Sequence, residues 1–195
     1  MRLLCGKFTL DLGRPLIMGV VNVTPDSFSD GGQFDSIDAA VSHAQRLVDE
    51  GADIIDIGGE STRPGAAEVG LDEERRRVLP VLERLASFDA PVSVDTRKPE
   101  LMREAVTAGA SMINDVEALQ SAGALAAVAG GDAAVCLMHK RGAPATMQND
   151  PRYDDVVADV AAFLADRVRA VCAAGISDER IVVDPGFGFG KTLAH

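Results

Sequence analysis

Six short apolar stretches recur along this chain, and each ends on a polar residue that leads into a turn or loop. The first stretch begins at Leu16, reads LIMGVVNV, and then changes at once to the polar TPDSFSDGG, which ends at Gly32. An apolar run of this length with β-branched valines predicts a buried strand, and the glycine-rich continuation predicts a loop. The polar residues at the six strand ends are Asn22, Asp56, Asp95, Asn114, His139 and Asp184.

Strands and helices are expected to alternate along the chain. The strands after the first are expected at 52–57, 91–95, 111–116, 133–138 and 180–183, and apolar residues at helical spacing predict helices at 36–50, 72–87, 99–108, up to 130, and 154–174. Ser36 is the expected N-cap of the first helix. Before the first main strand, the loosely alternating residues 3–12 predict a short hairpin or a lid.

The strands are almost continuously apolar, which indicates a parallel sheet with both faces covered. An open sheet would spread the six polar strand ends along one edge, whereas a (β/α)8 barrel gathers strand ends at one mouth. The sequence therefore favours an α/β fold of the TIM barrel type with six of the eight β/α units present. Apolar residues such as Ile17, Ile55, Val94 and Val183 are expected to line the barrel interior.

The overall charge excludes some classes of partner. A formal net charge of −11 argues against nucleic acids and anionic membranes, which bind to basic surfaces. No apolar run of about 18 residues predicts a membrane-spanning helix. The three cysteines, Cys5, Cys136 and Cys172, fit neither a disulfide framework nor a zinc spacing, and indicate a reducing cytoplasm.

The strand-end side chains suggest a ligand class. Carboxylates accept hydrogen bonds and an asparagine amide both donates and accepts, so the set suits a flat heterocycle with a donor edge. Asn22 beside Asp56 is also compatible with a hard cation. The segment GFGFGKT is no phosphate loop of the Walker type, because Pro185 occupies the position of the first glycine. Its glycines serve either a tight turn or the close approach of a ligand.

Six motifs together resemble dihydropteroate synthases, members of the pterin-binding barrel family. These motifs are NVTPDSFSDGG (22–32), DIGGESTRPGA (56–66), SVDTRKPE (93–100), INDV (113–116), LMHKRGAPATMQ (137–148) and DPGFGFGKT (184–192). The resemblance implies one pterin-binding domain over residues 1–195. It also implies a cytoplasmic transferase, a homodimer when full length, that condenses (7,8-dihydropterin-6-yl)methyl diphosphate with 4-aminobenzoate.

The resemblance also assigns roles to residues. Asp95, Asn114 and Asp184 would bind the pterin, with Thr62 and Phe189 as further substrate contacts. Asp95, Asp30 and Arg63 would be catalytic, and Asn22 would ligate the Mg²⁺ that holds the diphosphate. Asp30 would belong to a first loop, and Thr62 and Arg63 to a second, that close over the aminobenzoate.

The family's barrel continues through two further units, which carry a Ser-Arg-Lys motif and an Arg-x-His motif. The 195 residues stop before both, so on their own they are expected to be inactive and poorly folded. Two other functions stay open. One is a pterin-binding methyltransferase of the corrinoid-linked type, which shares the strand-end pattern, and the other is an inactive pterin-binding fragment.

Overall fold

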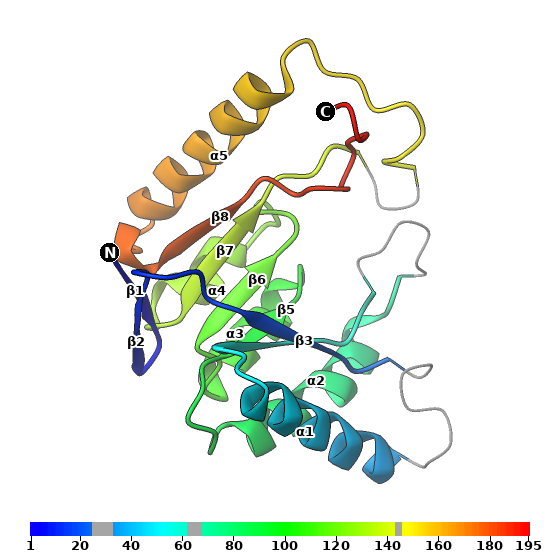
Figure 1. The fold of residues 1–195 in the computed structure, drawn as a ribbon, viewed down its shortest axis with the longest axis vertical. Coiled ribbons are helices and arrows are strands. Elements are labelled where there is room, and N and C mark those ends of the chain that lie inside the picture. Colours follow the sequence, from blue (N-terminus) through cyan, green and yellow to red (C-terminus); the bar gives the residue numbers. More distant parts are fainter. Residues whose placement is uncertain (25–32, 62–67, 143–145) are drawn as a thin grey trace.

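The computed structural model describes residues 1–24, 33–61, 68–142 and 146–195, and the side chains of 36–61 within the second range (Figure 1). Two sheets are present in this part of the chain: a two-stranded antiparallel hairpin and a six-stranded parallel sheet. The parallel strands follow one another in sequence order, as consecutive units of a (β/α)8 barrel do. The fold class expected from the sequence is confirmed.

Each predicted strand and helix is present, with bounds within a few residues of the expected ones. The parallel strands are β3 (Met18–Asn22), β4 (Ile54–Gly58), β5 (Val92–Asp95), β6 (Met112–Asp115), β7 (Ala134–Met138) and β8 (Ile181–Asp184). The helices are α1 (Gln33–Asp49), α2 (Leu71–Leu85), α3 (Pro99–Thr107), α4 (Ala124–Ala129) and α5 (Val156–Ala173), with a 3-10 turn η2 (Asp178–Arg180) before β8. Ser36 is not an N-cap, because α1 already begins at Gln33.

The main hydrophobic core lies between the sheet and the helices that cover its outer face. Ile55 and Val94 are fully buried in this core, packed with side chains of the helices. The expectation that they line the barrel interior is therefore wrong. Successive strand residues alternate between faces, and these two positions point outward.

The inner face of the sheet holds a smaller apolar cluster. It joins Leu3 and Cys5 of the hairpin to the first residues of three strands, Ile54, Met112 and Ala134, with Cys136 above them. The hairpin consists of β1 (Arg2–Cys5) and β2 (Phe8–Asp11), and Figure 1 shows it beside the start of β8. It therefore closes the amino-terminal end of the sheet as a plug, and the alternative of a lid over the strand ends is wrong.

The two outer strands of the parallel sheet are β3 and β8. Ile17, just before β3, is 60% exposed, and Val183 on β8 is 47% exposed. Neither residue is buried in the interior, contrary to expectation. The apolar interior positions are instead those that alternate with them, such as Met18 and Val182.

Candidate active site

Four strand ends form one row across the inner face of the sheet. In the parallel register Asn22 pairs with Gly58, Gly58 with Asp95, and Asp95 with Asn114. Neighbouring strands are about 4.8 Å apart, so Asp95 and Asn114 are direct neighbours. From Asn114 the row continues to Cys136 of β7 and Val182 of β8. Asp184, which pairs with Met138, lies two residues further along β8. The barrel stagger thus places Asp184 closer to the mouth than Asn114.

Asp95 is the most electrostatically perturbed member of this row. Burial raises the pKa of its carboxyl well above the usual range, and the nearby carboxylates of Asp56 and Asp115 raise it further. No described residue donates a hydrogen bond to it. The side chain lies over Gly58, where an added Cβ would be 3.5 Å from the Asp95 Cβ. A cationic group or a hydrogen-bond donor placed here would relieve the repulsion.

Asn114 is linked to a carboxylate deeper in the interior. Its Nδ2 donates a hydrogen bond of 3.2 Å to Oδ2 of Asp56, which is 4% exposed. Burial raises the pKa of Asp56, and the nearby Ser93 hydroxyl and the Asn114 amide partly oppose this shift. Asp56 pairs in register with Val20 rather than with Asn22, and it is engaged with Asn114. The arrangement gives no support to a shared cation site of Asn22 and Asp56.

Asp184 supports a tight turn and has one carboxylate oxygen with no donor among the described residues. Its Oδ1 accepts a 2.7 Å hydrogen bond from the backbone N–H of Gly186, and Oδ2 can accept from a ligand. Gly186 has a φ of 68°, and a Cβ there would lie 2.0 Å from the carbonyl oxygen of His139. Gly190 (φ 66°) is confined in the same way by the Arg141 carbonyl oxygen. These two glycines therefore serve the tight turn, one of the two alternatives left open by the sequence.

Lys191 holds this turn against the end of β7. It is 7% exposed, and its Nζ lies 2.9 Å from Nδ1 of His139, 3.0 Å from the Gly186 oxygen and 3.2 Å from the Phe189 oxygen. Burial lowers the pKa of Lys191, and burial followed by the lysine charge lowers the pKa of His139. An ammonium has three donors, and all three have acceptors here. Both side chains are therefore structural, a pairing that the sequence did not indicate.

Of the remaining predicted site residues, two lie within the described part of the chain and three lie outside it. Phe189 is half-buried in the turn, and its backbone N–H donates to the Gly186 oxygen at 3.1 Å. Asn22 is exposed at the end of β3. Asp30, Thr62 and Arg63 lie outside the described residues.

An ion-pair network, also unforeseen, lies beside β4 and β5. Lys98 contacts both Glu60 and Glu74, and Glu74 is 1% exposed. The neighbouring Arg97 donates to Glu68 at 2.7 Å and to Glu60 at 3.3 Å. Arg97 thus connects the residues on either side of the segment that carries Thr62 and Arg63. The sequence signal for it was the pair of cations, Arg97 and Lys98, that begins two residues after the strand-end Asp95.

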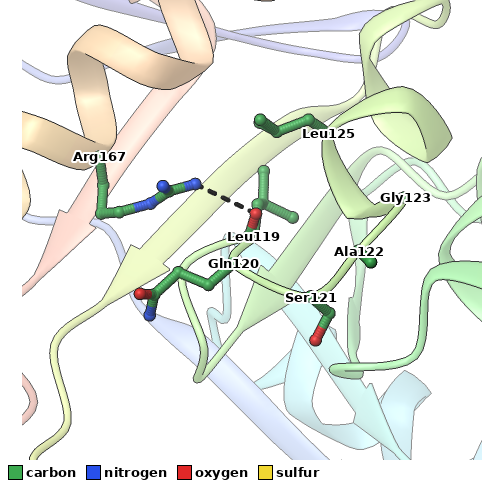
Figure 2. Close-up of a pocket in the computed structure, with 7 residues that line it drawn as sticks. All are labelled: Leu119, Gln120, Ser121, Ala122, Gly123, Leu125 and Arg167. Carbon is green, nitrogen blue, oxygen red and sulfur yellow. Dashed lines mark hydrogen bonds between the residues drawn. The ribbon is translucent and has the colours of Figure 1, made fainter.

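A pocket of about 380 Å³ lies away from the row, and Figure 2 shows its lining residues 119–123, Leu125 and Arg167. Ala118 and Leu119 both have positive φ, 53° and 56°, which is strained for residues with a side chain. Arg167 of α5 donates to both carbonyl oxygens, at 2.8 and 3.1 Å. Its guanidinium therefore stabilises a strained turn, and the pocket shares no residue with the strand-end row.

Comparison with known proteins agrees with the strand-end geometry. A family model described as "Pterin binding enzyme" matches residues 18–195. The dihydropteroate synthase of Escherichia coli (strain K12) is 52% identical over 196 residues, which cover 100% of this chain and 70% of that protein.

Two solved structures are also closely similar. The Yersinia pestis dihydropteroate synthase in a sulfonamide drug complex has a TM-score of 0.92 and 53% identity, covering 100% of this chain and 71% of that one. The Xanthomonas albilineans dihydropteroate synthase with 4-aminobenzoic acid has a TM-score of 0.91 and 57% identity, covering 99% and 69%. The Xanthomonas protein has also been solved with 7,8-dihydropteroate (TM-score 0.87, 54% identity, covering 100% and 69%).

Proposed function

The chain belongs to the dihydropteroate synthase family of pterin binding enzymes, and from this premise we propose how its residues carry out the family's reaction. In that reaction (7,8-dihydropterin-6-yl)methyl diphosphate and 4-aminobenzoate give 7,8-dihydropteroate and diphosphate. The high identity to synthases over the whole chain favours this function over the corrinoid-linked methyltransferase.

The pterin is proposed to bind to Asp95, Asn114 and Asp184. The observation that carries this assignment is the placement of all three on one half-buried inner face, with Asp95 lacking a described donor and Asp184 keeping one oxygen open. The pterin edge offers an amino group and ring N–H groups, which these carboxylates accept. Phe189, half-buried in the adjoining turn, is proposed to contact the flat face of the ring.

Asp95 is proposed to act in the chemical step as well. When the C–O bond to diphosphate breaks, the electron pair leaves with diphosphate and positive charge develops on the pterin methylene. The arylamine nitrogen then forms the new C–N bond and loses a proton. A buried carboxylate with a raised pKa, surrounded by other carboxylates, is stabilised by such a cation, so the barrier falls. Asp30 and Arg63 as catalytic residues and Thr62 as a substrate contact are proposed from the family resemblance alone.

Mg²⁺ is proposed to bind at Asn22. This side chain is exposed at the mouth-side end of β3, and its amide oxygen is a hard ligand, so the residue fits a cation that keeps several waters. The described residues contain no group of three or more His, Cys, Asp or Glu side chains suited to a metal. When bound, the cation would neutralise diphosphate charge. The rest of the chemistry is that of the protein side chains.

We further propose a cytoplasmic protein that forms a homodimer when full length. Supporting the first point, the three cysteines are all free, and two of them are buried. In the described part of the chain, no helix is both long and apolar enough to cross a membrane. The dimer rests on the family resemblance, and light scattering after size-exclusion chromatography tests it.

The function is tested by measuring dihydropteroate formation from the two substrates. The full-length protein should form product only with both substrates and Mg²⁺, and Asp184→Asn should bind the pterin at least tenfold more weakly. That substitution replaces one acceptor by a donor that faces a ligand donor and leaves a buried group unpaired, which costs about 1–3 kcal/mol. Pterin binding without product would support the inactive fragment, and an unchanged pterin affinity of Asp184→Asn would contradict the assigned site.

A further inference from the structure

Asp56 faces the barrel interior, one layer below the proposed pterin site. Its neighbours Ile55 and Ile57 belong to the outer core, whereas Ile54, on the same face as Asp56, belongs to the inner cluster. The same alternation puts Asn114 on the inner face, because Ile113 is in the outer core and Met112 in the inner cluster. The two polar side chains meet across the intervening β5, Asn114 Nδ2 donating to Asp56 Oδ2 at 3.2 Å.

This hydrogen bond fixes the orientation of an otherwise ambiguous amide. An asparagine amide has a donor end and an acceptor end of nearly equal size, so its neighbours decide which end faces the ligand. Oδ2 of Asp56 is the acceptor in this bond, and it therefore holds the NH₂ end of Asn114 toward Asp56. No described residue donates to the carbonyl oxygen of Asn114, so that acceptor is left for a ligand.

The surroundings of Asp56 satisfy its carboxylate only in part. Its Oδ1 is buried and has no hydrogen bond of good geometry to a described residue. The hydroxyl of Ser93, its register partner on β5, lies near enough to offset part of the effect of burial, but its Oγ also lacks a hydrogen bond of good geometry among these residues. A buried carboxylate with an unsatisfied oxygen is costly, and an apolar side chain of similar size is often neutral or stabilising in its place. A residue that costs stability is expected to serve a site.

We propose that Asp56 is a positioning residue, which orients the Asn114 amide so that its carbonyl oxygen faces a ligand N–H in the pterin site. This inference rests on the proposed function, because it concerns the same pterin. Asp56 acts through Asn114 and does not itself contact the ligand.

The test measures pterin affinity and stability in parallel. Calorimetric titration with a 6-hydroxymethyl-7,8-dihydropterin should show at least tenfold weaker binding for Asp56→Leu. Asp56→Asn should weaken pterin binding less than Asp56→Leu does. The substituted amide can still form a hydrogen bond with Asn114, but it no longer determines which end of the Asn114 amide faces the ligand. Urea unfolding of Asp56→Leu should show a stability equal to or above that of the unchanged protein. A loss of affinity together with a loss of stability would overturn the positioning role, and so would an affinity within twofold of the original.

Two controls make the test specific. In an Asn114→Ala background, Asp56→Leu should have no further effect on affinity, because the residue through which it acts is gone; a second full loss would overturn the inference. Ser93→Ala removes a buried hydroxyl from the same layer without touching the Asp56–Asn114 bond, and should bind pterin normally. If Ser93→Ala lost as much pterin affinity as Asp56→Leu, the inference would be overturned, because any change in this layer would then weaken pterin binding. If the unchanged protein does not bind the pterin, the proposed function fails instead.

Discussion

Asp95 stands directly opposite Gly58 in the pairing of β4 and β5, and its carboxylate lies over that glycine. A Cβ at Gly58 would be in ordinary contact with Asp95, 3.5 Å from its Cβ and 3.7 Å from Oδ2. At the adjacent Gly59, a Cβ would be 2.9 Å from Val78 Cγ2 and 3.0 Å from Glu74 Cγ, inside the packed core. A methyl group would therefore fit beside Asp95 at Gly58, whereas at Gly59 it would clash with packed side chains.

This contrast gives the first prediction. Gly58→Ala should fold with stability within about 0.5 kcal/mol of the original, because nothing clashes and alanine restricts the unfolded chain. It should nevertheless bind pterin several-fold more weakly, since the methyl group occupies the space beside Asp95. Gly59→Ala should lose about 1–3 kcal/mol of stability through overpacking. Urea unfolding and calorimetry on both variants check this, and equal stability losses would contradict it.

The second prediction concerns the pH dependence of stability at Asp95. A carboxyl whose pKa rises on folding binds protons more readily in the folded state, so stability increases as the pH falls through the raised pKa. The Asp95→Asn variant has no titratable carboxyl at this position and therefore no buried charge. The variant should therefore be more stable than the original at pH 7.5, and its advantage should shrink as the pH is lowered toward about 4, the usual aspartate pKa.

Thermal unfolding of both proteins across this pH range measures the difference. Asp89→Asn is the matched control for the loss of a carboxylate, because Asp89 is exposed in the turn before β5. An Asp95→Asn advantage that grew with acidity would show that burial does not penalise the charge of Asp95.

The third prediction concerns Arg97, which bonds Glu60 and Glu68 on either side of the segment with Thr62 and Arg63. Arg97→Gln should change stability by less than about 1 kcal/mol, since the pair with Glu68 is largely exposed. The KM for 4-aminobenzoate should rise several-fold while pterin affinity stays constant, because the ends of that segment are no longer tied together. Arg75→Gln, which breaks a comparable pair with Glu104, is the control. Equal kinetic effects of the two would refute the role of Arg97.

The alternation of strands and helices was predictable because apolar runs and their breaks depend on local sequence. The face to which a strand residue points was harder to predict. Ile55 and Val94 are as apolar as interior residues would be, and only the register and the packed helices put them outside. The same limit applies to the hairpin, whose position depends on Leu3 meeting strand starts far along the chain.

The candidate site was predictable where a polar residue ends an apolar strand, as with Asp95, Asn114 and Asp184. The partners of those residues were not. The Asn114–Asp56 bond spans 58 positions and the Lys191–His139 contact spans 52, and no local pattern records such pairs. A lysine after glycines suggests phosphate binding. Lys191 is instead buried, and it acts as a structural brace because its ammonium group donates to carbonyl oxygens of its own turn.

The last prediction tests that brace. Lys191→Met keeps the apolar length of the side chain but removes the donors to the Gly186 and Phe189 carbonyl oxygens and to His139. Unsatisfied buried acceptors cost about 1–3 kcal/mol each, so the variant should lose at least about 2 kcal/mol of stability. Because Gly186 is also bonded to Asp184, pterin affinity should fall too. Lys140→Met, which breaks the pair with Glu117, is the control and should lose less than half as much stability. If Lys191→Met unfolded at the same urea concentration as Lys140→Met, the lysine would not be a structural brace, and its donors would be free for a ligand.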